Sequence, residues 1–310
     1  MKQSIIILFL VSLFFQSEAQ TQSLAERLGY PAGTKLLIIH ADDLGVSHSE
    51  NMASIRAMEK GVVNSASIMV PCPWFPEIAA YAKTHPSTCF GLHLTLTSEW
   101  KLYKWGPVTS HDQVPSLLTP QGYLNETDSA FMHNAKAAEV EKELRCQIER
   151  AKQFGVDPTH FDAHMFAAGS TPEFVQILLK LGREYKVPVH VSKDFIQTIF
   201  KYDVSKYQTP TDIVVDKTIM ILSHEYKTGT EQYYINHLKS LANGLNVILL
   251  HAAYDNDEMQ AVTAGYDSFH APWRQKDFDF FTSEKCKKIL AEEKIKLVTW
   301  KEIRDKILRK

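Results

Sequence analysis

The sequence is poor in cysteine, has no excess of charge of either sign and shows no glycine- and serine-rich linker. Four cysteines among 310 residues, without a Cys-x-x-Cys pair, exclude a structural zinc knuckle. The 34 basic and 36 acidic side chains give a net charge of −2, so nucleic acid is not expected as a partner. With 45% hydrophobic residues, the composition is that of a globular protein with a large core. Free buried thiols are favoured over disulfides for Cys72, Cys89, Cys146 and Cys286.

The N-terminal segment has the pattern of a secretory signal peptide. Lys2 supplies one positive charge, residues 5–15 are apolar apart from Ser12, and small residues end the segment near Ala19. We therefore expect a signal peptide over 1–19, a mature domain over 20–310, and export to the periplasm or the extracellular space; an uncleaved membrane anchor is the alternative. Because no later stretch approaches about 18 uninterrupted apolar residues, no membrane span is expected in the mature chain.

Short apolar runs alternate with stretches of helical spacing from Lys35 onward, which predicts parallel strands joined by crossover helices. The expected strands are 35–40, 65–70, 89–95, 159–162, 188–192, 218–222, 246–251 and 296–299. The expected amphipathic helices are 49–60, 75–83, 139–154, 171–185, 230–242 and 283–293. Since no linker or repeat interrupts the alternation, the sequence predicts one α/β domain with about seven or eight mostly parallel strands.

Residues 98–129 break the alternation, because they have little periodicity and are rich in proline and tryptophan. Loops of this length are usually functional or mobile. If the segment follows a barrel strand, it overhangs the face where active sites form.

Polar side chains stand where the apolar strands end. Asp42 and Asp43 follow the first run, His93 ends the third, His164 follows the fourth and His251 ends the seventh. In a parallel barrel these strand ends share one face, so the side chains are expected to converge. Adjacent side chains of an extended chain point in opposite directions, so the two aspartates should have different partners. One could bind a metal while the other handles a proton.

One carboxylate with His93 and His164 would form a facial set of three metal ligands. Such a set leaves positions open for water and substrate, as hydrolytic metal centres require. A hydrogen-bonded core role is the alternative for a single histidine, and a helix cap or turn for an aspartate. His160 and Asp162 could orient a metal ligand, although structural support is the favoured role for His160.

Four blocks of the sequence resemble the YdjC-like carbohydrate deacetylase family, which includes chitooligosaccharide and hopanoid-sugar deacetylases. They are Ile-His-Ala-Asp-Asp-Leu-Gly at 39–45, Gly-Leu-His-Leu-Thr-Leu-Thr at 91–97, Pro-Thr-His-Phe-Asp-Ala-His at 158–164, and the late strand ending at His251. The resemblance implies a distorted, TIM-like β/α barrel as the catalytic domain. It also implies a metal-dependent hydrolase that removes acetyl groups from an N-acetylated oligosaccharide or sugar.

The resemblance further assigns roles within this site. One divalent metal ion, zinc or magnesium, would be held by Asp43, His93 and His164. By analogy with related polysaccharide deacetylases, Asp42 would be the general base and His251 the general acid. The chain departs from the family where it has Phe166 in place of a frequent histidine, and Ala252-Ala253 in place of a common Pro-Gly. These departures bear on substrate contacts and loop shape.

Aromatic and basic residues near the expected site are candidates for sugar contacts. The candidates are Trp105 in the long loop and Trp273 and Arg274 after the seventh strand. Their side chains have flat faces and hydrogen-bonding edges. Packing of the loops onto the barrel is the alternative for each aromatic residue. Two other functions stay open, a metal-dependent hydrolase of another ester or amide and a secreted glycan-binding protein with an inactive site. The identity of the sugar and the oligomeric state, including a homo-oligomer, also stay open.

Overall fold

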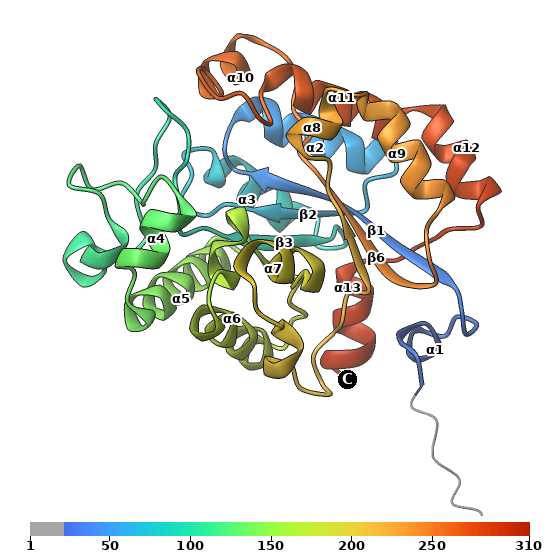
Figure 1. The fold of residues 1–310 in the computed structure, drawn as a ribbon, viewed down its shortest axis with the longest axis horizontal. Coiled ribbons are helices and arrows are strands. Elements are labelled where there is room, and N and C mark those ends of the chain that lie inside the picture. Colours follow the sequence, from blue (N-terminus) through green and yellow to red (C-terminus); the bar gives the residue numbers. More distant parts are fainter. Residues whose placement is uncertain (1–21) are drawn as a thin grey trace, which may run out of the picture.

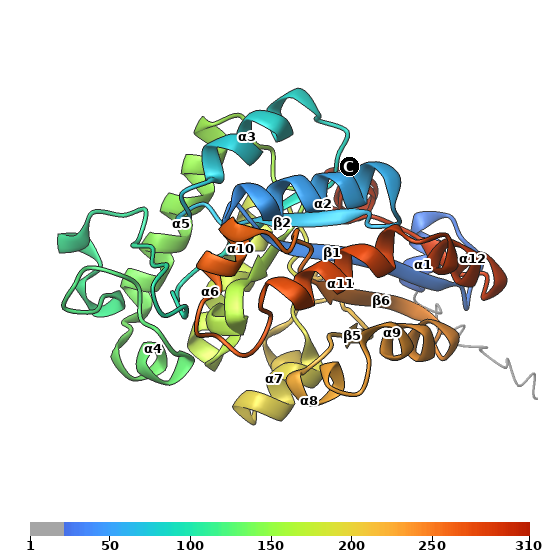
Figure 2. The same cartoon turned by 90° about the horizontal axis from the view of Figure 1, so that it is seen from above.

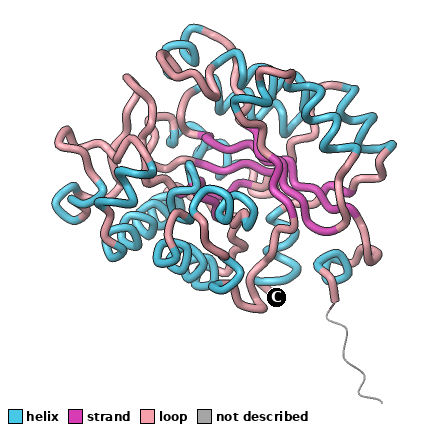
Figure 3. The backbone as a smooth tube through the Cα atoms, in the orientation of Figure 1, coloured by secondary structure: helices cyan, strands magenta, loops and turns pink. Residues whose placement is uncertain are grey.

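In the part of the chain that the structure describes, seven parallel strands form one curled sheet around which the helices pack (Figures 1 and 3). The computed structural model describes residues 22–310, so the signal peptide expected over 1–19 lies outside the described residues. The strands are β1 (Lys35–Leu44), β2 (Ser65–Ile68), β3 (Phe90–Leu94), β4 (Phe161–Ala163), β5 (Lys217–Ile219), β6 (Gly244–Leu250) and β7 (Lys296–Leu297). Their order is β4-β3-β2-β1-β6-β5, and β7 pairs with the start of β1. The predicted α/β class with a mostly parallel sheet is confirmed.

Helices cover the outside of the sheet, with α2, α9, α11 and α12 on one side and α5, α6 and α13 on the other (Figures 1 and 2). The helices are α1 (Leu24–Leu28), α2 (His48–Lys60), α3 (Phe75–Thr84), α4 (Asp128–Asn134), α5 (Ala137–Gln153), α6 (Pro172–Tyr185), α7 (Lys193–Phe200), α8 (Ser223–Tyr226), α9 (Thr230–Lys239), α10 (Asp257–Val262), α11 (Ala271–Thr282), α12 (Glu284–Glu292) and α13 (Trp300–Ile303). Figures 1 and 2 place the loops before α4 at the end of the molecule opposite α12. The carboxyl end of β1 points toward these loops.

The predicted strand 188–192 is wrong. Val189 makes one isolated bridge to Phe161 of β4 and the ladder goes no further, because Ser192 caps α7 and turns the chain into a helix. Among the described residues, no backbone hydrogen bond joins 188–192 to β5. His190 Nε2 lies 3.0 Å from Thr218 Oγ1 instead, so side chains close the barrel along this seam between 188–192 and β5.

Helix α11 was not predicted from the sequence. Its buried residues include Arg274 and Asp277 beside aromatic side chains, so it lacks the apolar stripe by which amphipathic helices are found. The loop expected before α4 is present and holds two short 3-10 turns, at His111–Gln113 and Pro115–Leu117.

The barrel interior is layered along the strands. Leu36 and Ile38 of β1 belong to an apolar cluster with Leu245, Val247 and Trp300 toward the amino-terminal ends of the strands. Because side chains alternate along a strand, the next inward residue of β1 is His40, which is fully buried. Polar side chains thus begin inside the barrel, below the strand ends.

The four cysteines are free thiols, as the sequence analysis favoured. Within residues 22–310, no helix is both long enough and apolar enough to cross a membrane.

Candidate active site

The carboxyl ends of the strands enclose a cavity of about 200 Å³. Its wall includes Asp42 and Asp43 at the end of β1, His93 of β3, His164 after β4 and His251 after β6. The structure therefore brings together all five polar residues that the sequence analysis placed at strand ends.

Asp43, His93 and His164 present ligand atoms to a common point. Asp43 Oδ1 lies 3.4 Å from His93 Nε2 and 3.3 Å from His164 Nδ1, and the three ligand atoms lie within 4.8 Å of one another. Asp43 Oδ1 is buried and has no hydrogen-bond partner among the residues that the structure describes. A buried carboxylate oxygen between two ring nitrogens is poorly satisfied by the protein alone, and this donor set suits a divalent cation. The residues present fit a metal site.

Each histidine of this set is oriented by a second carboxylate. His93 Nδ1 lies 3.1 Å from Asp162 Oδ1, and His164 Nε2 lies 2.9 Å from Glu99 Oε2. A carboxylate on one ring nitrogen fixes the ring and directs the other nitrogen, as in many metal sites. The sequence analysis named Asp162 for such a role but missed Glu99. The only signal for Glu99 was its position in the loop after β3, beside the expected site.

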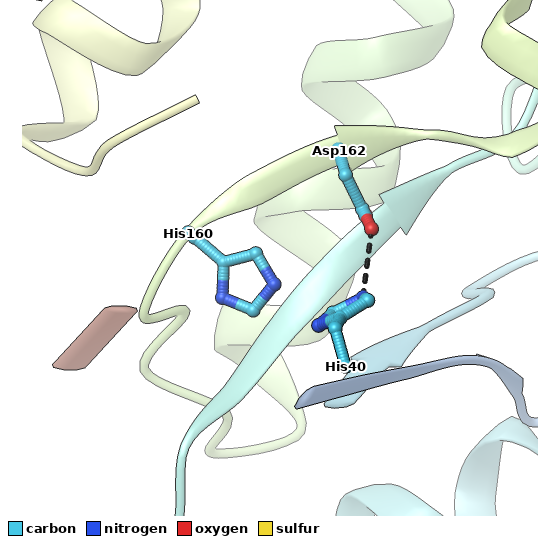
Figure 4. Close-up of side chains that lie close together, drawn as sticks. All are labelled: His40, His160 and Asp162. Atoms are coloured by element: carbon cyan, nitrogen blue, oxygen red, sulfur yellow. Dashed lines mark ion pairs between the residues drawn. The ribbon is translucent and has the colours of Figure 1, made fainter. Parts of the chain in front are cut away.

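Asp162 connects the site to a second buried cluster deeper in the barrel (Figure 4). Its Oδ2 atom lies 2.9 Å from His40 Nε2 and accepts a hydrogen bond from Ser67 at 3.0 Å. His160 lies beside His40 with ring centroids 5.0 Å apart, and a Cβ atom added at Gly91 would clash with its ring. His160 thus occupies space that only a glycine leaves free.

Both aspartates of β1 face the cavity, so the expectation that they point in opposite directions is wrong. The pairing of β1 with β2 shifts register between Ala41 and Leu44, and Asp43 has a left-handed backbone with φ of 63°. This irregularity breaks the alternation of an extended strand and turns the second carboxylate toward the first.

The two aspartates differ in their charged neighbours. Arg274 donates to Asp43 Oδ2 at 2.9 Å. Burial opposes ionisation of Asp43, but the Arg274 guanidinium together with the neighbouring His164 and His93 rings outweighs burial and holds the pKa of this carboxyl well below its usual range. Burial, and next the charge of Asp43, raise the pKa of Asp42 well above its usual range. One carboxylate is therefore held ionised, while the other binds a proton readily.

His251 lies beside Asp42, with 3.2 Å between its Nε2 atom and Asp42 Oδ1. Its backbone N–H donates to Asp277 Oδ2 at 3.2 Å, and its ring lies against Phe269. Burial, and next the charge of Arg274, lower the pKa of His251 to about 3, so the resting imidazole is neutral.

The three predicted sugar contacts are buried. Trp105 and Trp273 are 3% and 0% exposed, and neither lines the cavity as formed by the described residues. Trp105 packs edge-on against His164, while Trp273 stacks on Tyr226 at 4.1 Å. These indoles have no free face for a sugar, so the packing alternative holds for both. Arg274 does line the cavity, but its nitrogens are bonded to Asp43, Glu50 and the Phe269 carbonyl.

The sequence analysis missed the apolar part of the cavity wall. It is formed by Met165, Phe166, Ile199, Met220 and Phe269, which come from four separate segments of the chain. No periodic pattern joins these residues, so only the folded chain shows that they share a surface.

Comparisons with known proteins match most of the chain. A family model described as YdjC-like protein matches residues 36–292. A carbohydrate deacetylase from Brevibacillus brevis is 32% identical over 270 residues, covering 86% of this chain and 99% of that protein. A carbohydrate deacetylase from Thermus thermophilus is 30% identical over 288 residues, covering 91% of this chain and 98% of that protein. A crystal structure from Enterococcus faecalis V583, named for cellobiose-phosphate cleavage, has a TM-score of 0.71 at 25% identity and covers 87% of this chain and 99% of its own.

Proposed function

This chain belongs to the YdjC-like family, and we propose that it is a carbohydrate deacetylase that hydrolyses the acetamido group of an N-acetylated sugar. The observation that carries the proposal is the buried Oδ1 atom of Asp43 between His93 and His164, which has no hydrogen-bond partner within residues 22–310. It lies in a cavity that also holds Asp42 and His251. This arrangement combines a metal-ligand set with two groups able to move protons.

Asp43, His93 and His164 would hold one divalent cation, zinc or magnesium. When bound, such an ion lowers the pKa of a water molecule and polarises the acetyl carbonyl. Arg274 keeps the Asp43 carboxyl ionised, while Asp162 and Glu99 hold the two imidazole rings, so these residues prepare the ligand set before any ion arrives.

Asp42 is the proposed general base. Its raised pKa favours uptake of a proton from the attacking water, because a more basic carboxylate binds the proton more tightly. His251 is the proposed general acid, which delivers a proton to the nitrogen of the departing amine. Since resting His251 is neutral, it gains its proton only as the reaction proceeds, and Asp42 Oδ1, 3.2 Å from its Nε2 atom, is the neighbouring group with which it can share one.

The experiment is an acetate assay on metal-replete protein with a panel of N-acetylated oligosaccharides. We expect acetate release that stops on chelation and returns when the ion is added back. The matched control is Asp42→Asn, which keeps the shape of the side chain but removes the basic oxygen. Cleavage of ester substrates together with silence across the whole panel would assign a different carbonyl substrate and overturn the proposal.

We also propose that the protein acts after export, on the strength of the charged, apolar and small residues in positions 1–19. Fractionation of cells that express the full chain with a carboxyl-terminal tag, followed by mass spectrometry of the mature amino terminus, tests this. A mature chain that begins near residue 20 outside the cytoplasm supports export, while an intact cytoplasmic chain contradicts it.

A further inference from the structure

A chain of buried polar side chains runs from the amino-terminal side of the barrel to His93. Cys89, Ser65 and His40 lie at its start, and Asp162 joins them to His93; each of the five is at most 5% exposed. Figure 4 shows His40 of β1 directed toward Asp162 of β4 across the interior. The proposed function uses Asp162 and His93 but gives no task to His40.

The Asp162 carboxylate sets the direction of the hydrogen bonds around it. A carboxylate accepts hydrogen bonds and donates none, so His40 Nε2, which lies 2.9 Å from Asp162 Oδ2, carries the proton of that contact. His93 Nδ1, which lies 3.1 Å from Asp162 Oδ1, carries a proton for the same reason. Ser67 donates to the same Oδ2 atom at 3.0 Å. Donors on both oxygens therefore hold the carboxylate in one orientation.

The second nitrogen of the His40 ring agrees with this direction. His40 Nδ1 lies 2.9 Å from Ser65 Oγ. In a neutral imidazole one nitrogen donates and the other accepts, so Nδ1 accepts from the Ser65 hydroxyl when Nε2 donates to Asp162. The Cys89 thiol in turn donates to Ser65 Oγ at 3.6 Å. Each hydrogen bond of the chain thus points toward Asp162.

The hydrogen bond to Asp162 leaves Nε2 of a neutral His93 without a proton. Which nitrogen of a histidine binds a metal is set by the hydrogen bond that the other nitrogen makes. His93 Nε2 therefore directs a lone pair into the ligand set, where Asp43 Oδ1 lies 3.4 Å away. A cation between these two acceptor atoms would satisfy both. The orientation of Asp162 thus decides which nitrogen His93 offers to the ion.

We propose that His40 is a positioning residue, which holds the Asp162 carboxylate so that His93 presents a bare Nε2 atom to the ion. The inference rests on the metal site of the proposed function, but not on the identity of the substrate. It assigns a task to a fully buried histidine that does not line the cavity formed by the described residues.

Two substitutions at position 40 separate the two nitrogens of the ring. His40→Gln keeps a donor near the position of Nε2, whereas His40→Asn keeps an amide near Nδ1 and leaves no donor for Asp162. We expect His40→Asn to weaken zinc affinity roughly tenfold and His40→Gln by less than about threefold, as measured by competition with a chelator. Equal losses in the two variants would overturn the proposal, because a histidine that only fills space is replaced no better by one amide than by the other.

A double substitution tests whether His40 acts through Asp162. In the Asp162→Asn background, His40→Asn should change zinc affinity by less than about twofold, because the carboxylate that His40 holds is already absent. A further loss of roughly tenfold would show that His40 acts by another route and would contradict the proposal. Circular dichroism checks that each variant is folded.

Nitrogen NMR of the native, metal-free protein with isotope-labelled histidine separates failure of this inference from failure of the proposed function. We expect His40 to carry its proton on Nε2 and to have a bare Nδ1, whereas a proton on Nδ1 would overturn the direction of the chain. If the native protein binds neither zinc nor magnesium, the metal site of the proposed function fails, and the state of the His40 ring then decides the inference. The same measurement decides it if His40→Asn does not fold.

Discussion

Two clusters inside the barrel have the same ligand types, one aspartate and two histidines, but different surroundings. Asp43, His93 and His164 form one cluster, while His40, His160 and Asp162 form the other, and in each the ligand atoms lie within 4.8 Å of one another. The first lines the cavity and holds a carboxylate oxygen without a hydrogen-bond partner among the described residues.

The deeper cluster is largely satisfied by the protein itself. His40 lies within hydrogen-bond distance of Ser65, Ser67 and Asp162, and both oxygens of Asp162 have partners. Ligand atoms at suitable spacing therefore do not define a metal site by themselves. His160 Nε2 of the deeper cluster also lacks a hydrogen-bond partner among the described residues, so the opening to the cavity is what distinguishes the first cluster. The second cluster supports His93 through Asp162.

The largest effect is expected when the first cluster loses its carboxylate. Asp43→Ala should abolish both metal binding and acetate release, because it removes the atom shared by the two histidines. Metal content measured by mass spectrometry and acetate release are the readouts. The matched variant His160→Gln in the deeper cluster should keep a full equivalent of metal. Loss of one equivalent in His160→Gln would show that the deeper cluster also binds an ion.

A large effect on rate alone is expected at Asp42. Asp42→Asn should lower kcat by about 10²–10⁴-fold, since the amide cannot accept the proton of the attacking water. Metal content should stay at the level of the native protein, which separates this residue from Asp43. A parallel loss of bound metal would place Asp42 among the ligands instead.

A smaller effect is expected at the residue that joins the two clusters. Asp162→Asn should weaken metal affinity by about 10–100-fold, because His93 loses the carboxylate that orients its ring. Competition with a chelator of known affinity measures this change. Glu99→Gln, which acts on His164 in the same way, should give a similar loss. Unchanged affinity in both variants would contradict the orienting role.

The smallest expected effect on the reaction comes from Gly91, which leaves room for the His160 ring. Gly91→Ala should reduce the free energy of unfolding by about 1–3 kcal/mol, since the added methyl group clashes with a buried ring. Denaturant unfolding of the metal-free protein is the measurement. Gly169→Ala is the control and should be milder, because its Cβ would meet only the flexible end of Ile196. Equal losses would show that the fit of His160 is not the cause.

The sequence predicted which residues lie at the site better than it predicted where their side chains point. Asp43, His93 and His164 were found because polar side chains follow buried apolar strands, and this pattern depends only on local order along the chain. The shared direction of Asp42 and Asp43 depends on a left-handed backbone and a shift of register with β2, which no periodicity encodes.

Residues that depend on tertiary partners were harder to predict. Arg274 was expected to contact the sugar, yet its guanidinium bonds to Asp43 and Glu50, and sequence spacing does not show which acid a buried arginine will meet. The segment 188–192 has the composition of a strand, but the capping side chain of Ser192 starts a helix there. Parallel strands and crossover helices were predictable because buried strands form short apolar runs and the helices keep an amphipathic spacing.

The seam between 188–192 and β5 lies away from the strands that carry the proposed ion-holding residues. The residues proposed to hold the ion come from β1, β3 and the end of β4, which share an unbroken run of backbone ladders. Ile199 and Met220, which line the cavity, belong to the segments that flank the seam. If these two segments moved apart, the cavity would accept a bulkier or branched ligand, while the strands that carry the ion-holding residues would keep their positions. The size of ligand that the cavity accepts and the geometry of the ion-holding residues can therefore change independently.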